Sequence, residues 1–185
     1  MLDVPSHLLA ERRRLGLDLF DEMWEGELHM VPPPSEEHQR TGGRLYVALS
    51  GIADTIGLHV RYETGVFDPA NPTDESYRTP DLVVFDEAAR SARGVEGRAL
   101  LVVEIRSPGD ETFDKLPFYE RMGVAEMLVI DRDSKALRRW VRTDDGLDEV
   151  GPDSAGSHQL TALPVTLHTI DGRLVVRGHG HESLI

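Results

Sequence analysis

Three polar residues near the middle of the chain have the types and positions needed to hold a metal ion and activate water. Asp81 comes directly before the apolar run 82–85, Glu104 follows the apolar run 100–103, and Lys115 lies shortly after it. Two carboxylates on neighbouring strands can hold a hard divalent cation such as Mg²⁺, which keeps waters for a nucleophile or a phosphate. A lysine beside that ion could orient the attacking water or neutralise charge on a phosphate. This chemistry requires all three side chains to converge.

Two of these residues belong to the segment 99–131, around which the chain is organised. Residues 100–103 are apolar and rich in branched side chains, as in a strand covered on both faces. Polar residues at 107–110 break the run, and a second apolar run follows at 127–130. The helix expected between them has an apolar face made of Phe113, Leu116, Tyr119 and Met122. An acid at the end of a central strand, with a helix just beyond it, is a common arrangement for a site on an α/β scaffold.

The start of this helix decides what surrounds Lys115. Pro117 is tolerated only in the first helical turn, so we expect the helix to begin with Asp114 as its cap. Lys115 then lies at the positive pole of the helix, which electrostatics disfavours unless an anion is near. Either Asp114 or Glu111 supplies that anion, or the two acids named above and a phosphate do.

The N-terminal part predicts a short helix and a hairpin. Residues 5–17 fit an amphipathic helix with Ser6 as a possible cap and with Leu8, Leu9 and Leu15 on its inner side. Residues 19–31 fit a hairpin around the turn Glu25–Gly26.

A long helix is expected after three consecutive prolines. Ser35 is its predicted cap, and Gly57 its predicted end. Glu36 and Glu37 favour the positive pole of its first turn, and His38 follows them. The inner stripe consists of Leu45, Leu49, Ile52 and Ile56.

The remaining segments read as strands, turns and a tail. Strands are predicted at 58–67, 81–85 and 137–141, with weaker strands at 147–150, 159–163 and 173–176. A loop is expected at 68–79, a charged excursion with a turn of helix at 86–97, and a turn around Lys135. The pair His179 and His181 in the glycine-rich tail is interpreted as disordered rather than as a metal site.

Composition narrows the class of protein. At 185 residues with 39% hydrophobic content, we expect one domain over 1–185, with a core at about 19–142 and C-terminal strands and a tail at 143–185. The chain has no cysteine, which excludes disulfides, and shows neither a signal peptide nor a run as long as a membrane span, so a cytoplasmic protein is the expectation. The formal net charge of -13 counts against a nucleic-acid partner unless basic residues cluster locally.

Four stretches together resemble, in order and spacing over residues 19–131, the Uma family of restriction endonuclease-like proteins in the PD-(D/E)xK nuclease superfamily. They read GELHMVPPPSEEHQR, RTPDLVVF, LVVEIRSPGDETFDKLPFYERMGV and EMLVID. The resemblance implies that Asp81 and Glu104 are the two metal-binding acids. The lysine usual two residues after the glutamate is Arg106 here, and Lys115 matches the displaced lysine of this family.

The resemblance also implies an α/β fold of restriction endonuclease type, with a mixed central sheet flanked by helices and an N-terminal hairpin. Glu37 lies where related nucleases carry an additional acid, and His38 matches a family histidine and is a candidate substrate-binding residue. Arg106 either contacts a phosphate of the substrate or forms a salt bridge with an acid. The expected function is Mg²⁺-dependent or Mn²⁺-dependent cleavage of DNA by a bacterial homodimer. The alternative is a non-catalytic interaction or regulatory module that retains the fold.

Overall fold

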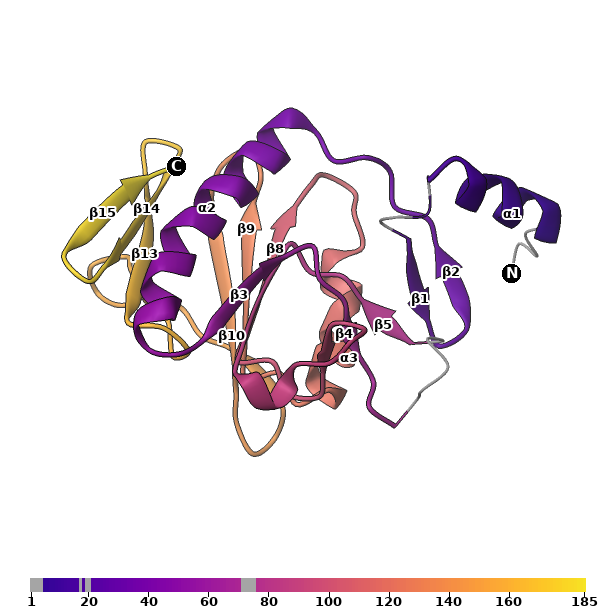
Figure 1. Cartoon of the computed structure of the whole chain (residues 1–185). Coiled ribbons are helices and arrows are strands. Elements are labelled where there is room, and N and C mark those ends of the chain that lie inside the picture. Colours follow the sequence, from indigo (N-terminus) through magenta and orange to yellow (C-terminus); the bar gives the residue numbers. More distant parts are fainter. Residues whose placement is uncertain (1–4, 17, 19–20, 71–75) are drawn as a thin grey trace.

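A computed structural model of the chain describes residues 5–16, 18, 21–70 and 76–185. It contains a six-stranded central sheet, a five-stranded sheet near the N-terminus and a four-stranded C-terminal sheet (Figure 1). The helices are α1 (Ser6–Arg14), α2 (Glu36–Thr55) and α3 (Leu116–Arg121), with short 3₁₀ turns at Glu87–Ala89 and Thr112–Lys115. The mixed α/β architecture with a central sheet confirms the predicted fold class.

The central sheet has the strand order β11-β10-β9-β8-β6-β3. Its strands are β3 (His59–Tyr62), β6 (Leu82–Phe85), β8 (Leu101–Arg106), β9 (Glu126–Asp131), β10 (Leu137–Arg142) and β11 (Leu147–Glu149). β8 and β9 are parallel, whereas β6 is antiparallel to β8 and β3 to β6. The predicted β-α-β unit is therefore confirmed, with α3 as its crossover.

The two faces of the central sheet are covered by different elements. Val84, Val103 and Ile130 pack with Leu45 and Leu49 of α2. Their sequence neighbours on the opposite face, Val83, Val102 and Val129, pack with Phe118 and Tyr119 of α3. Because alternate residues of a strand point to opposite faces, the apolar runs of β6, β8 and β9 serve both layers at once.

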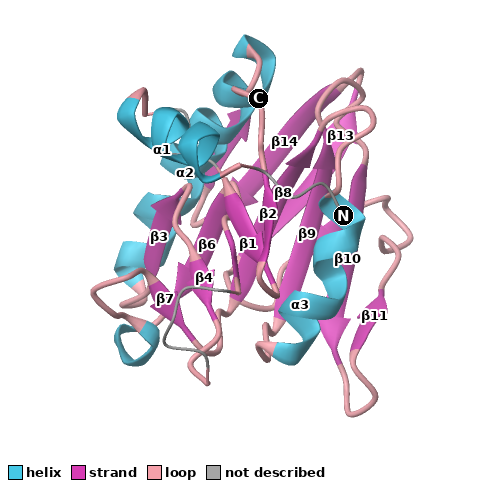
Figure 2. Cartoon of the chain, turned by 90° about the vertical axis from the view of Figure 1, so that its right-hand side faces the viewer, coloured by secondary structure: helices cyan, strands magenta, loops and turns pink. Residues whose placement is uncertain are grey.

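The smaller sheets lie on either side of this core. The N-terminal sheet has the order β2-β1-β5-β4-β7, and the C-terminal sheet the order β12-β13-β14-β15. The strands of these sheets are β1 (Glu22–Trp24), β2 (Glu27–His29), β4 (Val66–Phe67), β5 (Tyr77–Arg78), β7 (Val95–Glu96), β12 (His158–Gln159), β13 (Val165–Ile170), β14 (Arg173–Gly178) and β15 (His181–Leu184). Figure 2 shows the hairpin β1–β2 in front of the central sheet. Leu167, Leu174 and Val176 of the C-terminal sheet belong to the same core cluster as α2.

The long helix forms largely as predicted. The Ser35 hydroxyl accepts a hydrogen bond from the backbone N of His38 at 3.3 Å, which confirms the cap. Leu45, Leu49 and Ile52 are buried, as expected. Ile56 is 45% exposed, so its assignment to the inner stripe was wrong. The helix ends at Thr55, and Ile56 already departs from its geometry.

The prediction for the first helix was wrong in two respects. Pro5 is its N-cap, and Ser6 already belongs to the helix. Leu8 and Leu15 are 48% and 52% exposed rather than buried. α1 projects from the end of the molecule beside β2, away from the central sheet (Figure 1). The hairpin around Glu25–Gly26 is confirmed, while residues 17, 19 and 20 lie outside the described residues.

Three further strand predictions need correction. The predicted strand 58–67 is split between β3 and β4, because Glu63 takes a φ of 45° and the chain passes into another sheet. The segment 68–79 is not only a loop, since it contains β5. At the C-terminus the strand at 159–163 is replaced by β12, and the strands β13 and β15 were missed.

The histidine pair of the tail is ordered rather than disordered. His179 and Gly180 have φ values of 48° and 76°, and they form the turn between β14 and β15. His181 pairs with Gly178 at the start of β15. Within the described residues no helix is long and apolar enough to cross a membrane.

The neighbouring glycines of α2 should respond oppositely to alanine. A Cβ on Gly42 would lie 2.8 Å from the hydroxyl oxygen of Tyr62, whereas a Cβ on Gly43 has nothing within 4 Å. We expect Gly42→Ala to lower the free energy of unfolding by about 1–2 kcal/mol through overpacking. Gly43→Ala should raise it by up to about 1 kcal/mol through helix propensity. Urea unfolding measures both, and equal stabilisation by the two variants would contradict the close packing at Gly42.

Candidate active site

Asp81 directly precedes β6, and Glu104 lies on the adjacent antiparallel strand β8. Leu82 pairs with Val103, so the next pair outward along the two strands is Asp81 and Glu104. The Asp81 carboxylate also accepts a hydrogen bond from the backbone N of Ile105 at 2.6 Å, which ties it to β8. Directly opposed residues of an antiparallel pair share one face of the sheet. The two predicted acids are therefore brought together.

Glu104 is buried inside the strand rather than at its end. The residue is 4% exposed, and one carboxylate oxygen accepts a hydrogen bond from the Tyr119 hydroxyl at 2.6 Å. The other accepts a hydrogen bond from Lys115 Nζ at 3.2 Å. Burial raises the pKa of Glu104; the Lys115 charge opposes this, while the charges of Asp81 and Glu22 add to it. The protonated carboxyl is thus favoured more than for an exposed glutamate.

Lys115 lies at the N-terminus of α3, where it is held by two acids. The predicted cap was wrong: α3 begins at Leu116, Lys115 itself occupies the N-cap position, and Asp114 belongs to the preceding 3₁₀ turn. The ammonium group donates hydrogen bonds to Glu22 at 2.8 Å and to Glu104 at 3.2 Å. Its partners therefore include the predicted Glu104, and neither Asp114 nor Glu111 supplies the anion.

Glu22 is the site residue that the sequence did not reveal. It lies on β1 and is 2% exposed. Besides Lys115, its carboxylate accepts hydrogen bonds from the backbone N of Thr79 at 2.8 Å and from the indole N of Trp24 at 2.7 Å. Glu22 thereby joins the N-terminal hairpin to the segment before Asp81 and to α3. An acid inside a three-residue strand was the available signal, but the distance of 93 positions to Lys115 concealed the contact.

His38 contacts the first acid directly. Its Nε2 lies 2.6 Å from Oδ1 of Asp81. Burial lowers the pKa of His38, but the hydrogen bond and the charge of Asp81 outweigh burial, and the pKa is raised overall. The first turn of α2 thus places the His38 ring, whose protonated form is favoured, against the Asp81 carboxylate. From the sequence, His38 was a candidate substrate-binding residue, and its contact with Asp81 was not predicted.

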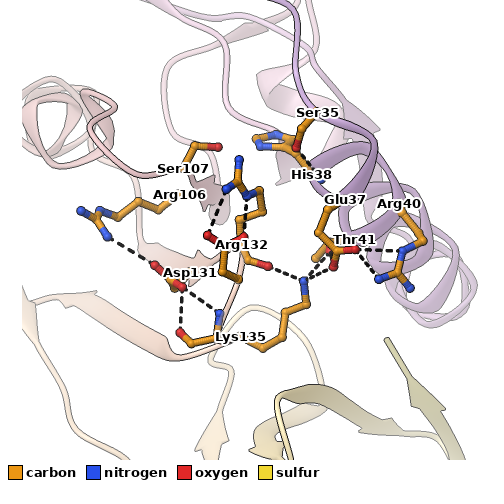
Figure 3. Close-up of polar contacts among 12 residues, drawn as sticks. Ser35, Glu37, His38, Arg40, Thr41, Arg106, Ser107, Asp131, Arg132 and Lys135 are labelled. Carbon is orange, nitrogen blue, oxygen red and sulfur yellow. Dashed lines mark hydrogen bonds and ion pairs between the residues drawn. The ribbon is translucent and has the colours of Figure 1, made fainter.

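Glu37 points elsewhere, although it precedes His38. Its carboxylate accepts hydrogen bonds from Lys135 Nζ at 2.6 Å and from Arg40 (Figure 3). The hydrogen bond from Lys135, followed by that from Arg40, lowers the pKa of Glu37 to about 2. Lys135 lies in the predicted turn, with a φ of 59°, but it is only 3% exposed. The structure therefore places Glu37 in a contact between α2 and this turn, and its partners Lys135 and Arg40 form no hydrogen bond or ion pair with Asp81 or Glu104.

Of the two alternatives predicted for Arg106, a phosphate contact or a salt bridge with an acid, the structure shows the salt bridge. Its guanidinium forms a salt bridge with Asp131 across the parallel pair β8–β9, at 3.3 Å. Figure 3 shows its side chain extending toward Asp131 and away from His38. The Nε atom of Arg106 is buried without a hydrogen-bond partner in the described part of the chain.

The donor set of the site suits a hard divalent cation held by few protein ligands. No group of three or more His, Asp or Glu residues within the described ranges is arranged to enclose a metal. Asp81 and Glu104 supply two carboxylates, and each oxygen that accepts a hydrogen bond from the protein keeps a second lone pair. Mg²⁺ typically binds one or two carboxylates and completes its coordination with water and phosphate. The residues present fit such an ion.

The chain is similar to a protein family and to a solved structure. The model of the Uma2 family, described as "Putative restriction endonuclease", matches residues 17–171. The crystal structure of a "putative nuclease belonging to DUF820" from Anabaena variabilis superposes with a TM-score of 0.59 at 15% identity. That match covers 74% of this chain and 78% of the other, and it shows that the fold is shared. No curated protein matches the chain. Because the family model matches residues 17–171, which is most of the chain, the chain belongs to the Uma2 family.

Proposed function

We propose that the protein is a metal-dependent endonuclease that hydrolyses phosphodiester bonds of DNA. The observation that carries the proposal is the convergence of Asp81, Glu104 and Lys115, with Lys115 bonded to Glu104 and the two acids on adjacent strands. Membership of the restriction endonuclease family supports the same chemistry. In this function Asp81 and Glu104 hold Mg²⁺ or Mn²⁺, and DNA is the substrate.

The protein residues around the acids have distinct roles in this proposal. A bound divalent ion would polarise the phosphate and supply a metal-activated water. Lys115, buried between two glutamates, presents a fixed positive charge beside the scissile phosphate. His38 and the backbone of Ile105 hold the Asp81 carboxylate, while Tyr119 holds that of Glu104. Such bonds to ligating carboxylates fix their orientation. Glu37 and Arg106 act outside this set, through Lys135 and Asp131.

Metal binding and cleavage measured on the same samples test the proposal. We expect calorimetry to detect Mn²⁺ or Mg²⁺ binding by the wild-type protein and plasmid DNA to be cleaved in the presence of the ion. Asp81→Asn and Glu104→Gln should each reduce cleavage by at least about 10³-fold, because each removes a charged ligand. Glu149→Gln is the matched control, since its carboxylate forms an exposed ion pair with Arg138 away from the site. A folded wild-type protein that neither binds metal nor cleaves DNA would overturn the proposal.

Metal affinity should rise with pH through the neutral range. The pKa of Glu104 is raised, mainly by burial, so a proton occupies this carboxyl at pH values where an exposed glutamate is ionised. A metal ion requires the carboxylate, so binding must release that proton, and it becomes easier as pH rises. Calorimetry in two buffers of different ionisation enthalpy measures the release. The same measurement on His38→Gln separates the part of this pH dependence that comes from the histidine bound to Asp81. A metal affinity that does not change with pH would contradict the expectation.

A non-catalytic module with the same fold is the second candidate function. The formal net charge of -13 favours it, because an acidic surface repels DNA. A wild-type protein that binds the metal ion but does not cleave DNA would support this candidate. A homodimer and a cytoplasmic location are proposed by analogy with nucleases of this fold, and light scattering of the purified protein tests the dimer.

A further inference from the structure

A groove runs between α2 and β15, next to the candidate active site. It consists of two adjoining cavities of about 610 Å³ and about 420 Å³ that share Arg40, Arg44, Leu184 and Ile185 as lining residues. Figure 1 shows β15 beside α2 and the last residue close to that helix. We call this feature the α2–β15 groove.

The groove contains guanidinium groups that the protein leaves uncompensated. The chain has 33 acidic and 20 basic residues, and most of the arginines accordingly bond to an acid. Among the residues that the structure describes, the side chains of Arg44, Arg98 and Arg173 form no hydrogen bond or ion pair. Arg44 and Arg173 line the same cavity of the groove. Two free arginines that face one cavity in an acidic protein indicate an anionic ligand.

The acids of the groove are mostly neutralised within the protein. Glu37 accepts hydrogen bonds from Lys135 and Arg40, and Asp133 accepts one from Arg132 at 2.8 Å. Asp171 lines the cavity as well, and it lies in the turn before Arg173. Of the three acidic side chains that line this cavity with Arg44 and Arg173, two are therefore neutralised by other basic residues, and Asp171 remains.

The groove begins beside the residues that hold Asp81. Gln39 lines it and bonds to both Tyr62 and Glu63, while the preceding His38 bonds to Asp81. At 1.5 Å per helical residue, Arg44 lies about 9 Å along α2 from His38. That length corresponds to about two to three nucleotides, at 3.4 Å per nucleotide along one strand.

We propose that the α2–β15 groove binds the sugar-phosphate backbone of a nucleic acid strand about two to three nucleotides from the bond to be cleaved. Arg44 and Arg173 contact the phosphates. The inference rests on the proposed function, because it takes the strand bound in the groove to be the strand that is cleaved at Asp81 and Glu104. It also explains how so acidic a protein holds a polyanion: the favourable charge is local and lies beside the site.

Binding of a labelled oligonucleotide tests the groove separately from cleavage. The affinities of the wild-type protein and of the double variant Arg44→Ala/Arg173→Ala for single-stranded and duplex DNA are measured by fluorescence anisotropy. The measurement is repeated over a series of salt concentrations, with Ca²⁺ in place of Mg²⁺. We expect affinity to fall about tenfold or more, and the slope of log affinity against log salt to shrink by about 2 for a duplex. Arg98→Ala is the matched control, because Arg98 is also exposed and unpaired but lies outside the groove.

The outcomes separate the groove from the proposed function. Weaker binding and a smaller salt slope for the double variant, with Arg98→Ala unchanged, support the groove even if no cleavage is found. Unchanged affinity and slope in the double variant, together with cleavage by the wild-type protein, overturn the groove and leave the nuclease assignment intact. A wild-type protein that binds neither form of DNA overturns the groove, and capture of a protein by this surface would then identify a different ligand.

Discussion

A Lys115→Met variant is expected to lose about 3–5 kcal/mol of unfolding free energy, together with DNA cleavage. Lys115 is the cation between Glu22 and Glu104, which are 2% and 4% exposed. Removing one member of a buried ion cluster leaves the other charges uncompensated in a medium that solvates them poorly, and such losses are of this size. Methionine keeps most of the side-chain volume, so the loss reports charge rather than a cavity.

Urea unfolding in the presence of EDTA measures this loss, and the second lysine of the chain supplies the control. Lys135→Met also removes a buried ammonium group, but its partner Glu37 keeps Arg40 and is 33% exposed at its side chain, so a smaller loss is expected. The difference in unfolding free energy between the wild-type protein and Lys115→Met should decrease as pH falls. Burial raises the pKa of Glu104 in the folded protein, so the folded state takes up the neutralising proton before the unfolded state does. Equal losses for both lysine variants, or a deficit that grows as pH falls, would contradict the arrangement.

Glu126→Ala should be comparably damaging, although Glu126 lies away from the candidate active site. Glu126 is 0% exposed and bonds to Arg139, which is itself only 9% exposed. It also accepts hydrogen bonds from the backbone N of Thr161 at 2.9 Å and of Ala162 at 3.1 Å. We expect a loss of about 3–5 kcal/mol, because the substitution removes the acid that neutralises a buried guanidinium and leaves two backbone amides unpaired.

The same experiment tests the single-domain prediction. Glu126 joins the central sheet to the connection between β12 and β13 of the C-terminal sheet, and side chains of both sheets pack in one cluster. We therefore expect one cooperative transition, with tryptophan fluorescence and circular dichroism coinciding. Glu149→Ala is the matched control, since its ion pair with Arg138 is exposed and should contribute at most about 1 kcal/mol. Two separate transitions in the wild-type protein would show that the C-terminal sheet unfolds on its own.

Predictions from the sequence were accurate where the determining interactions are local or involve neighbouring strands. Ser35 caps α2 because a side chain three residues away suffices. The β-α-β unit followed from two apolar runs with a helical period between them. The approach of Asp81 to Glu104 followed from placing each acid at the end of a buried run, since neighbouring strands align such ends. These features need little knowledge of how distant segments pack.

The parts that sequence reasoning missed depend on distant contacts. Leu8 and Leu15 were expected on the inner side of α1, yet both are exposed, because α1 projects away from the central sheet (Figure 1). The strands β13 and β15 form in a segment of weak alternation, and their pairing within one sheet stabilises them. Strand formation depends on neighbours more than helix formation does, so these short strands leave a weak signal in the sequence.

By itself, the sequence determined the fold class, the two acids beside buried apolar runs and the lysine at the start of the following helix, because periodicity and local spacing encode all of these. Only the tertiary structure decided which partner each charge meets. Lys115 meets Glu22 across 93 positions, and Lys135 meets Glu37 across 98. No sequence pattern specifies such pairs, because burial selects them only after the hairpin, α2 and the central sheet have packed. Once they are packed, a buried charge without a partner would cost more free energy than the fold can spare.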